Sequence, residues 1–388
     1  MENLLHLVSN ATKQNMDWNG IASALSSFAG PMSKTEQDPK FHSEGDVWTH
    51  TKQVCETLVT LNAFRALSEE KQQAVFLAAL LHDIGKVPTT RWEDGRWTSP
   101  NHTLVGSKMA RQFLWQTLGL CGTPEKQQLR ETVCNLIRYH SFPPHAIDDP
   151  NGRRKLLAMA ANGRNCPMFT LELLCILCEA DACGRVCTDE QDRVQMAEQV
   201  QLCREFAKEA GCYTEPFPFP SPHTRFSYLS GKDIIPEAEL YNDTWGEVIL
   251  LSCLPGTGKD TWIRENCPHM PMISLDEIRR ELGISPTDNQ RKVVDVARDR
   301  AKELLRAKRA FVWNATNLSP MVRSRQIQLF SQYGAACRIV YLETEWGEQF
   351  RRNAARAEVV PESAICRMMD DLVLPEVKEA HRVDWLCV

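Results

Sequence analysis

The sequence predicts two domains of different class, an all-α domain followed by an α/β domain with a parallel sheet. Helical periodicity without alternating strands extends over about residues 3–212. From residue 247 onward, short apolar runs alternate with helical segments, which is typical of a parallel sheet covered by helices. Between the two regions, five prolines at residues 216–236 exclude a helix interior. We assign 1–215 to the first domain, 216–243 to a linker and 244–388 to the second domain.

The composition is that of a globular protein with room for two cores. The chain has 388 residues, of which 43% are hydrophobic and 24% are charged. A net charge of -5 excludes a surface that is basic throughout, so any contact with nucleic acid should be local. The start, MENLLHLVSN, lacks a basic leader, and no apolar run approaches the length of a bilayer span. We expect a cytoplasmic protein without a membrane partner, whose fifteen cysteines are free thiols.

The first domain carries histidines and aspartates at the ends and on the inner faces of its expected helices. These helices cover residues 47–64, 69–84, 104–118, 124–139 and 169–184. The candidate metal ligands are His50, His82, Asp83, His102, His140 and Asp181. Imidazole and carboxylate together suit a divalent transition metal, and an aspartate between two groups of histidines can bridge two ions. A lone histidine would more often be structural, but LAALLHDIGKVP runs an apolar helix directly into His82, Asp83 and a glycine.

The segment LLHDIGK resembles the signature of the HD-superfamily metal phosphohydrolases. The other pieces of that pattern follow in order over most of residues 40–185: His50, Asn101-His102-Thr103 with Gly106, IRYH ending in His140, and EADACG with Asp181. The resemblance implies that the six candidate residues hold two divalent transition metals such as Mn²⁺, Ni²⁺ or Co²⁺. It also implies a phosphohydrolase reaction.

The segment KFHSEGDVWTH, which ends in His50, is similar to the HD domain attached to bacterial tRNA nucleotidyltransferases. Those domains act on 2′-phosphate and 2′,3′-cyclic phosphate ends, so the resemblance implies chemistry at a ribose phosphate. His42 and His145 lie near the ligand pieces. They either support the ligands and contact the substrate, or are exposed loop histidines.

Four cysteines in the first domain could be mistaken for a metal site. The pair Cys175 and Cys178 has zinc-like spacing, with Cys183 and Cys187 following. The first pair, however, lies in an apolar helix, and the spacing to the later two matches no common cluster. We expect these cysteines to act as small hydrophobic residues.

The stretch EVILLSCLPGTGKDTWI, residues 247–263, predicts a phosphate-binding loop between a buried strand and a helix. Cys253 replaces the first glycine of the usual pattern, and Asp260 replaces the Ser or Thr that binds magnesium, with Thr261 one position later. Either Asp260 or Thr261 can therefore contact Mg²⁺. The residues expected to bind the nucleotide are Pro255, Gly256, Thr257, Gly258, Lys259, Asp260 and Thr261.

Three further strands are expected in the second domain, at residues 272–275, 310–313 and 337–342. The intervening helices are expected at 289–308, 320–333, 346–357 and 361–372, with another beginning at Asp276. Ligands of such sheets bind at the carboxyl ends of the strands. The phosphate-binding loop, Asp276 and Asn314 all follow expected strands, so we expect them to share one edge of the sheet.

Most of residues 247–372 resembles the 5′-OH polynucleotide kinases of the phage type. The loop PGTGK matches their phosphate loop, and Asp276 with Arg279 matches their general base and acceptor-phosphate arginine. Arg352 and Arg356, before Val360-Pro361, match their lid arginines, and four-residue spacing on a helix places both on one face. The resemblance implies that these residues and Lys259 are catalytic, with ATP or another NTP and Mg²⁺ as cofactors.

Together the two halves resemble the bacterial HD-Pnk family of RNA end-healing enzymes. This resemblance implies removal of a 2′-phosphate or 2′,3′-cyclic phosphate and phosphorylation of a 5′-OH. The implied partners are RNA ends, with DNA 5′-OH ends left open, and a separate RNA ligase. One alternative is a nucleoside or sugar kinase fused to an HD nucleotidase, and another is a nucleotide-sensing HD module without turnover. Arg279 favours a polynucleotide, because an acceptor with an internal phosphate needs a cation.

Overall fold

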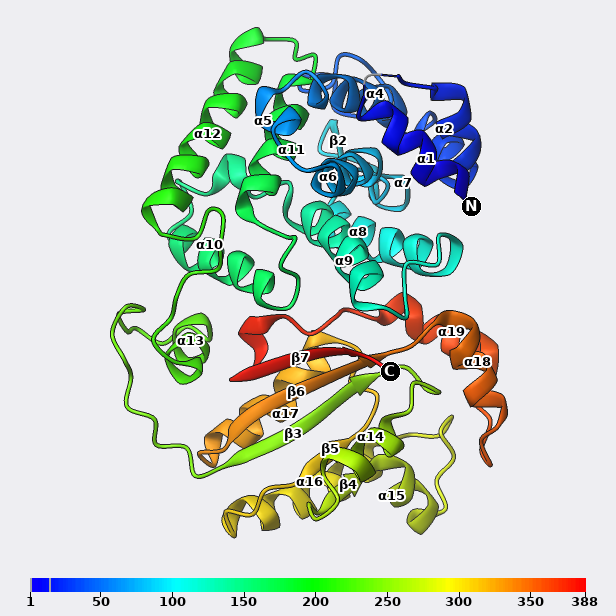
Figure 1. Ribbon diagram of the computed structural model, residues 1–388, viewed down its shortest axis with the longest axis vertical. Helices are drawn as coiled ribbons and strands as arrows, with labels where there is room; N and C mark the ends of the chain where they lie inside the picture. The colour runs from blue at the N-terminus through cyan, green and yellow to red at the C-terminus, as the bar shows by residue number, and fades with distance from the viewer. Residues whose placement is uncertain (1, 14) are drawn as a thin grey trace. The chain divides into compact units, whose positions relative to one another are not determined.

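The computed structural model describes residues 2–13 and 15–388 and shows two compact units (Figure 1). Met1 and Gln14, which fall in the first expected domain, lie outside the described residues. One unit comprises residues 1–120 and 125–217, and the other comprises residues 121–124 and 218–388. Across the described ranges, none of the helices combines the length and apolar character that crossing a membrane requires.

The first unit is helical, as the sequence predicts. Its α-helices are α1 (Glu2–Ala11), α2 (Trp18–Ala24), α3 (Ser26–Met32), α4 (Val47–Leu58), α5 (Asn62–Arg65), α6 (Glu69–Leu81), α7 (Lys86–Thr89), α8 (His102–Gln112), α9 (Pro124–Tyr139), α10 (Gly152–Ala161), α11 (Leu171–Cys183) and α12 (Glu190–Glu209). Helix α6 begins where the Ser68 side chain accepts a hydrogen bond from the Lys71 N–H, and residues 74–81 are all buried. Helices α4 and α11 pack with α6, so the ligands that these three helices carry meet in the core.

Some expected helices differ from those observed. The segment 47–64 divides into α4 and α5, and the segment 104–118 divides into α8 and a π-helical turn, η1 (Phe113–Thr117). Strands β1 (Arg91–Glu93) and β2 (Arg96–Thr98) form an antiparallel hairpin that the sequence reading did not predict. Three-residue strands are too short for an alternating pattern to be recognised.

The second unit contains a five-stranded parallel sheet with the order β4-β5-β3-β6-β7. Its strands are β3 (Glu247–Cys253), β4 (Met272–Ser274), β5 (Val312–Asn314), β6 (Ala336–Glu343) and β7 (Arg382–Cys387). Its α-helices are α13 (Pro222–Leu229), α14 (Lys259–Asn266), α15 (Leu275–Leu282), α16 (Arg291–Arg306), α17 (Pro320–Gln332), α18 (Trp346–Ala354) and α19 (Glu362–Asp371).

Helices cover both faces of this sheet (Figure 1). Val248 and Leu250 of β3 join a core with α16 and α17, whereas Ile249 and Leu251 join a second core with α14. The alternation follows from the pleat of the strand, which points successive side chains to opposite faces. Ser274 of β4 pairs with Asn314 of β5, so the chain leaves both strands at the same edge.

Three features of the second unit differ from the expectations. Strand β7 and helix α13 were not expected, and α18 ends at Ala354, so Arg356 follows the helix rather than sharing its face with Arg352. Helix α13 begins with Pro222 at its first position, after Ser221, whose side chain accepts from the Thr224 N–H. A proline at that position costs no hydrogen bond, which is why a proline-rich segment contains a helix.

Candidate metal centre and phosphate-binding site

The four predicted histidine ligands surround the carboxylate of Asp83, itself a predicted ligand. His82 Nε2 and His50 Nε2 lie 3.2 and 3.9 Å from Asp83 Oδ2. His102 Nε2 and His140 Nε2 lie 3.6 and 3.7 Å from Asp83 Oδ1. Asp181 joins the cluster through its Oδ1, 3.0 Å from His50 Nε2. Four segments far apart in the sequence thus place imidazole nitrogens around one aspartate.

Backbone carbonyls fix the orientation of three of the histidines. The Nδ1 atoms of His82, His102 and His140 lie 2.8, 2.9 and 2.8 Å from the carbonyl oxygens of Ala79, Ser99 and Ile137, each three residues earlier. A carbonyl oxygen can only accept, so each Nδ1 carries a proton and Nε2 is the ring nitrogen left for a metal ion. A histidine held in this way presents Nε2 as a metal ligand.

Gly85 lets two of these segments approach each other. A Cβ at position 85 would lie 2.0 Å from the His102 carbonyl oxygen and 2.5 Å from the Gly106 nitrogen. Only glycine permits that contact, so the HDIG turn can lie directly against the start of α8. The glycine therefore contributes to placing His102 opposite Asp83.

The donor set fits divalent metal ions. Among the described residues, the potential metal groups in this cluster are His50-His82-Asp83, His82-His140-Asp181 and Asp83-His102-His140. His82 Nε2 and Asp83 Oδ1 are buried and make no hydrogen bond, a costly state that a metal ion would relieve. Burial opposes ionisation of Asp83, but contacts with His82 and Lys86 hold its pKa well below the usual range. The carboxylate is therefore charged, as a metal ligand must be.

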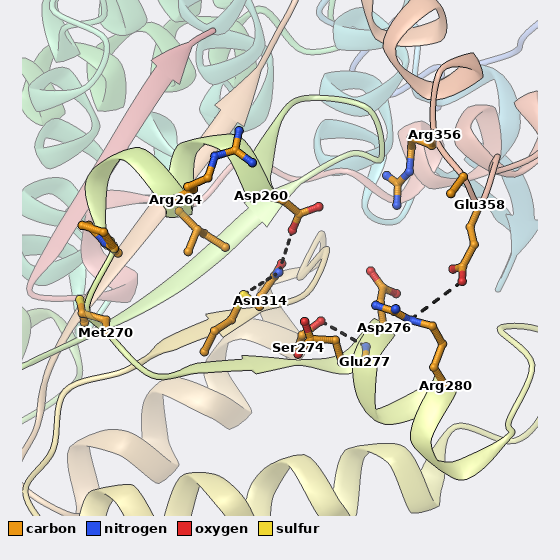
Figure 2. Close-up of a pocket in the computed structure, with 15 residues that line it drawn as sticks. Asp260, Arg264, Met270, Ser274, Asp276, Glu277, Arg280, Asn314, Arg356 and Glu358 are labelled. Atoms are coloured by element: carbon orange, nitrogen blue, oxygen red, sulfur yellow. Dashed lines mark hydrogen bonds and ion pairs between the residues drawn. The ribbon is translucent and has the colours of Figure 1, made fainter.

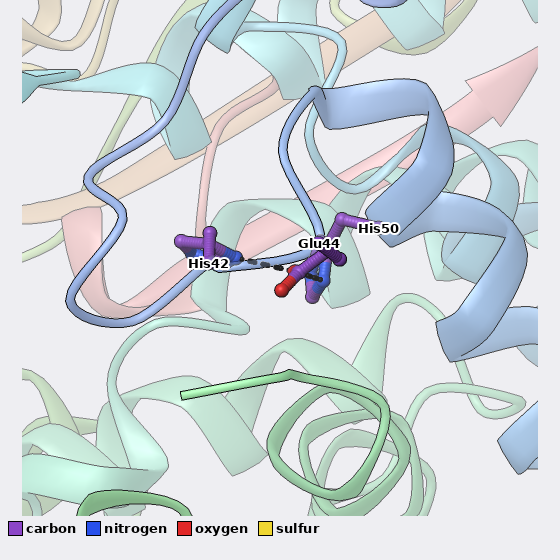
Figure 3. A group of neighbouring side chains, drawn as sticks. All are labelled: His42, Glu44 and His50. Carbon is purple, nitrogen blue, oxygen red and sulfur yellow. Dashed lines mark hydrogen bonds and ion pairs between the residues drawn. The ribbon is translucent and has the colours of Figure 1, made fainter. Parts of the chain in front are cut away.

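Glu44 contacts the fourth histidine and also His42 (Figure 3). Its Oε1 lies 2.8 Å from His50 Nδ1 and 2.9 Å from His42 Nδ1, and its side chain is buried. The rings of His42 and His50 meet edge to face with centroids 4.6 Å apart. His42 is thus a buried neighbour of a predicted ligand and not an exposed loop histidine. Sequence reasoning singled out His42 but not Glu44.

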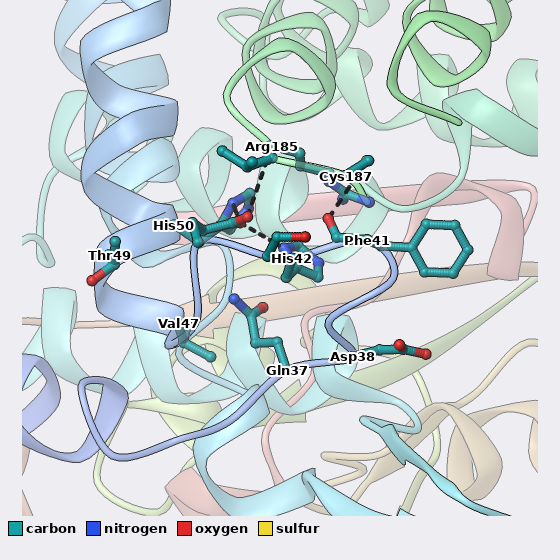
Figure 4. Close-up of polar contacts among 12 residues, drawn as sticks. Gln37, Asp38, Phe41, His42, Val47, Thr49, His50, Arg185 and Cys187 are labelled. Carbon is teal, nitrogen blue, oxygen red and sulfur yellow. Dashed lines mark hydrogen bonds and ion pairs between the residues drawn. The ribbon is translucent and has the colours of Figure 1, made fainter. Parts of the chain in front are cut away.

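The segment that carries His42 is joined to the chain after α11 (Figure 4). Ser43 N donates to the Val186 carbonyl at 2.7 Å, and Val186 N donates to Glu44 Oε2 at 3.0 Å. Arg185 forms an ion pair with Asp181, in which Nη2 donates to Oδ2 at 2.7 Å. These contacts hold Glu44 and Asp181 on either side of His50.

A cavity of about 370 Å³ opens beside this cluster. Its lining includes three predicted site residues, His102, His140 and Asp181, and also His42 and the exposed His145. Lys86 and Arg185 supply positive charge to the same cavity. The lining also contains Arg96, and a cavity with metal-ligand donors and three basic side chains suits a phosphate ester.

The predicted phosphate-binding loop has the backbone that its glycines allow. Gly256 and Gly258 have φ angles of 86° and 96°, in the left-handed region. A Cβ at position 256 would lie 2.6 Å from the Gln349 carbonyl oxygen of α18. Arg352 of the same helix donates from Nη1 to the Thr257 carbonyl at 3.2 Å. Helix α18 therefore lies over the loop.

Lys259, Asn314, Asp260 and Asp276 form one hydrogen-bonded network, and Figure 2 shows its link between Asn314 and Asp260. Lys259 Nζ donates to Asn314 Oδ1 at 2.9 Å and to Asp276 Oδ2 at 3.2 Å. Asn314 Nδ2 donates to Asp260 Oδ1 at 3.0 Å. Asn314 is buried at the end of β5, so its amide links the phosphate loop to both carboxylates. Its position after a strand was the signal available in the sequence.

Asp276 lies in a cavity of about 620 Å³ with Asp260 and Asn314. Burial opposes its ionisation, but Lys259 and Arg279 lower its pKa, so it is a carboxylate at neutral pH. Arg279 forms an ion pair with Asp276 and donates from Nε to Gln290 at 2.7 Å. Three other arginines line the cavity: Arg264, Arg280 and Arg356.

The other predicted residues differ in whether they line the cavity around Asp276. Asp260 lines this cavity, whereas Thr261 is not among its lining residues. The Thr261 hydroxyl accepts a hydrogen bond from Arg264 at 3.3 Å. Arg352 contacts the phosphate loop and Arg356 lines the cavity. Cys175 and Cys178 are buried in α11. Within the described part of the chain, the potential metal groups contain only histidine and carboxylate ligands.

Comparison with known proteins gives a family match for each unit. Residues 47–185 match the family model of the HD domain, and residues 248–375 match that of an AAA domain. Among solved structures, the chain is similar to a gluconokinase from Sinorhizobium meliloti 1021, with 17% identity over 37% of this chain and 83% of that chain and a TM-score of 0.27. The chain thus joins a helical HD domain to an α/β domain with the fold of a P-loop kinase.

Proposed function

We propose that the protein heals broken RNA ends, as the HD-Pnk family does. In this proposal, the HD unit removes 2′-phosphate and 2′,3′-cyclic phosphate ends, and the kinase-like unit transfers the γ-phosphate of an NTP to a 5′-OH. The observation that supports the polynucleotide part is the cavity around Asp276, whose lining contains Arg264 and Arg356 and also Arg280, which forms an ion pair with Glu358. An acceptor with internal phosphates uses such cations, whereas a free nucleoside or sugar does not.

In the kinase reaction, Asp276 accepts the proton of the attacking 5′-hydroxyl. The hydroxyl oxygen forms a bond to the γ-phosphorus, the bond from that phosphorus to the bridging β–γ oxygen breaks, and NDP leaves. Lys259 reaches Asp276 at 3.2 Å, so it can contact phosphate oxygens close to the acceptor. Asp260 is the residue that would hold Mg²⁺, because its carboxylate faces Asn314 within the cavity.

In the hydrolase reaction, divalent ions held by the histidine–aspartate cluster would activate water and neutralise phosphate oxygens. His50, His82, Asp83 and Asp181 would hold one ion, and Asp83, His102 and His140 would hold the other. Lys86 and Arg185 place positive charge in the same cavity. Lys86 Nζ lies 2.7 Å from Asp83 Oδ2, so it also compensates the charge of that carboxylate. Ribose specificity is proposed from the segment around His42, which lines this cavity.

One experiment tests both halves. RNA with a 5′-OH and either a 2′-phosphate, a 2′,3′-cyclic phosphate or a 3′-phosphate is incubated with and without NTP across a panel of divalent metals. We expect 2′-phosphate and cyclic ends to be better substrates than a 3′-phosphate, and a DNA 3′-phosphate to be poor. Equal turnover of a DNA 3′-phosphate and an RNA 2′-phosphate would contradict the ribose specificity.

Two variants separate the activities. His82→Ala or Asp83→Ala should lose end-phosphate removal and keep 5′ phosphorylation, because these residues lie only in the first unit. Undiminished hydrolysis in Asp83→Ala would refute the metal site. Transfer to a free nucleoside or sugar, with none to a 5′-OH oligonucleotide, would replace this proposal by the small-molecule kinase.

A further inference from the structure

The hairpin β1–β2 forms part of the wall of the hydrolase cavity. Arg96, Trp97, Thr98 and Ser99 line the cavity together with His102 and His140. The hairpin turns through Asp94 and Gly95, with φ angles of 50° and 79°, as two-residue hairpins require. A hydrogen bond of 2.8 Å between the Thr90 and Ser99 hydroxyls closes its base. In the described part of the chain, its two strands pair with each other as a two-stranded sheet.

One face of the hairpin carries two tryptophans. Trp92 and Trp97 are direct cross-strand partners, so both side chains stand on the same face. Their rings meet edge to face with centroids 5.2 Å apart, and Trp92 is 58% exposed. A cross-strand tryptophan pair stabilises a short hairpin, but that role does not require Trp97 to line the cavity or Trp92 to be exposed. Because the two rings are in contact, the aromatic face adjoins the cavity.

Positive charge accompanies this aromatic face. Arg96 is exposed and lines the cavity, and its cross-strand partner Glu93 forms an ion pair with Arg91. Lys86 and Arg185 lie in the same cavity, next to the predicted metal ligands. Aromatic rings beside cations suit a ligand that alternates flat bases with phosphates, which is single-stranded nucleic acid. A duplex would hide its bases from these rings.

We infer that the Trp92–Trp97 face stacks the bases at a single-stranded 3′ end whose terminal phosphate lies at the Asp83 cluster. Arg96 contacts a backbone phosphate of the same strand. This inference rests on the proposed function and extends it, because it gives the HD unit a preference for polynucleotide ends over small phosphate esters. The ribose end is selected in the cavity, and the strand is bound outside it.

The test compares hydrolysis of two substrates by the full chain, loaded with the metal that supports activity. One is a 5′-phosphorylated RNA oligonucleotide with a 2′-phosphate end, which the kinase cannot use, and the other is glycerol 2-phosphate, which has no base. The variants are Trp92→Leu, which keeps an apolar cross-strand partner, and Arg96→Ala, which leaves the tryptophans intact. Trp18→Leu is the matched control, because Trp18 forms a similar edge-to-face pair with Trp48 outside the cavity lining.

Stacking contributes about 1–3 kcal/mol per base. We therefore expect the ratio of kcat/KM on RNA to kcat/KM on glycerol 2-phosphate to fall by at least about fivefold in Trp92→Leu. The change should lie mainly in KM for RNA, and Arg96→Ala should also make that KM less sensitive to salt. The control should keep the ratio of the native protein.

The outcomes are distinguishable from those that test the function itself. Native-like ratios in both Trp92→Leu and Arg96→Ala, with RNA still hydrolysed, would overturn this inference and leave the proposed function standing. A duplex with a blunt 2′-phosphate end that is hydrolysed as well as the single strand would also overturn it. Failure of the metal-loaded native protein to hydrolyse any RNA end would overturn the proposed function, and this inference with it.

Discussion

Replacing Glu44 by glutamine tests how the metal centre is supported. Glu44 Oε1 contacts the Nδ1 atoms of both His50 and His42, at 2.8 and 2.9 Å. His50 in turn directs Nε2 to Asp181 at 3.0 Å. Glu44→Gln keeps the shape of the side chain but removes its negative charge. His50 therefore loses the carboxylate that makes its Nε2 a stronger metal ligand and holds its ring in place.

The expected loss is confined to one of two ions. Replacing such a supporting carboxylate typically weakens metal affinity about 10–100-fold, which corresponds to about 1.4–2.8 kcal/mol of binding free energy. The group Asp83-His102-His140 contains no contact with Glu44, so its ion should bind as in the native protein. The change should appear as one weakened site out of two.

The assay is calorimetric titration of the metal-free full chain with Mn²⁺, together with metal content after dialysis. Glu205→Gln is the control, because Glu205 is a half-exposed glutamate on α12 whose contacts are Gln201 and Lys208. We expect two sites of native affinity in the control. Two native-affinity sites in Glu44→Gln as well would refute the reasoning, and so would equal weakening of both sites.

Three further predictions concern the second unit. Lys259→Ala and Asp276→Ala should each abolish 5′ phosphorylation while end-phosphate removal continues, and near-normal kinase activity in Asp276→Ala would remove it as the general base. A fragment 218–388 should fold and keep NTP-dependent activity. A fragment 240–388 lacks α13, which belongs to the second unit, and should melt at a lower temperature. Equal melting temperatures of the two fragments would contradict this. Burial, together with the neighbouring His223 and Arg225, lowers the pKa of His381 from 6.5 to about 4. As the pH drops from 6.5 to 4, the unfolded chain therefore binds a proton at this histidine before the folded unit does. The thermal stability of the unit should fall over this range, and it should fall less in His381→Gln.

The parts of the fold that could be predicted are those with long periodic patterns. Helix α9 was predicted with the bounds that it has, because its apolar residues repeat at helical spacing over sixteen positions. Strand β7 was not predicted, because RVDWLC alternates weakly and its place at the edge of the sheet depends on pairing with β6. Helix α13 was missed because its proline was read as a helix breaker and not as a first residue.

The candidate sites divide in the same way. Motif spacing identified the six metal ligands and the phosphate loop, since each falls at the end or on the inner face of a recognisable element. Glu44 and Arg185 were not singled out, because neither belongs to a recognised motif and their contacts with His50 and Asp181 appear only in the folded chain. Asn314 was expected at the sheet edge, but its bond to Lys259, 55 positions away, was not. The role of Arg279 at the acceptor phosphate stays a prediction. In the structure its guanidinium contacts Asp276 and Gln290, and Arg264, Arg280 and Arg356 line the cavity.

The carbonyls behind His82, His102 and His140 have a consequence for variation. Every amino acid carries a main-chain oxygen, so exchanges at Ala79, Ser99 or Ile137 leave the acceptor in place as long as the helix ends keep their course. The position of the proton on these three rings is therefore set by the course of the main chain and not by neighbouring side chains. His50 is the exception, because its support is a side chain that a single codon change can remove. Substitutions in the surrounding sequence should therefore leave His82, His102 and His140 correctly oriented, whereas a substitution of Glu44 would disturb His50.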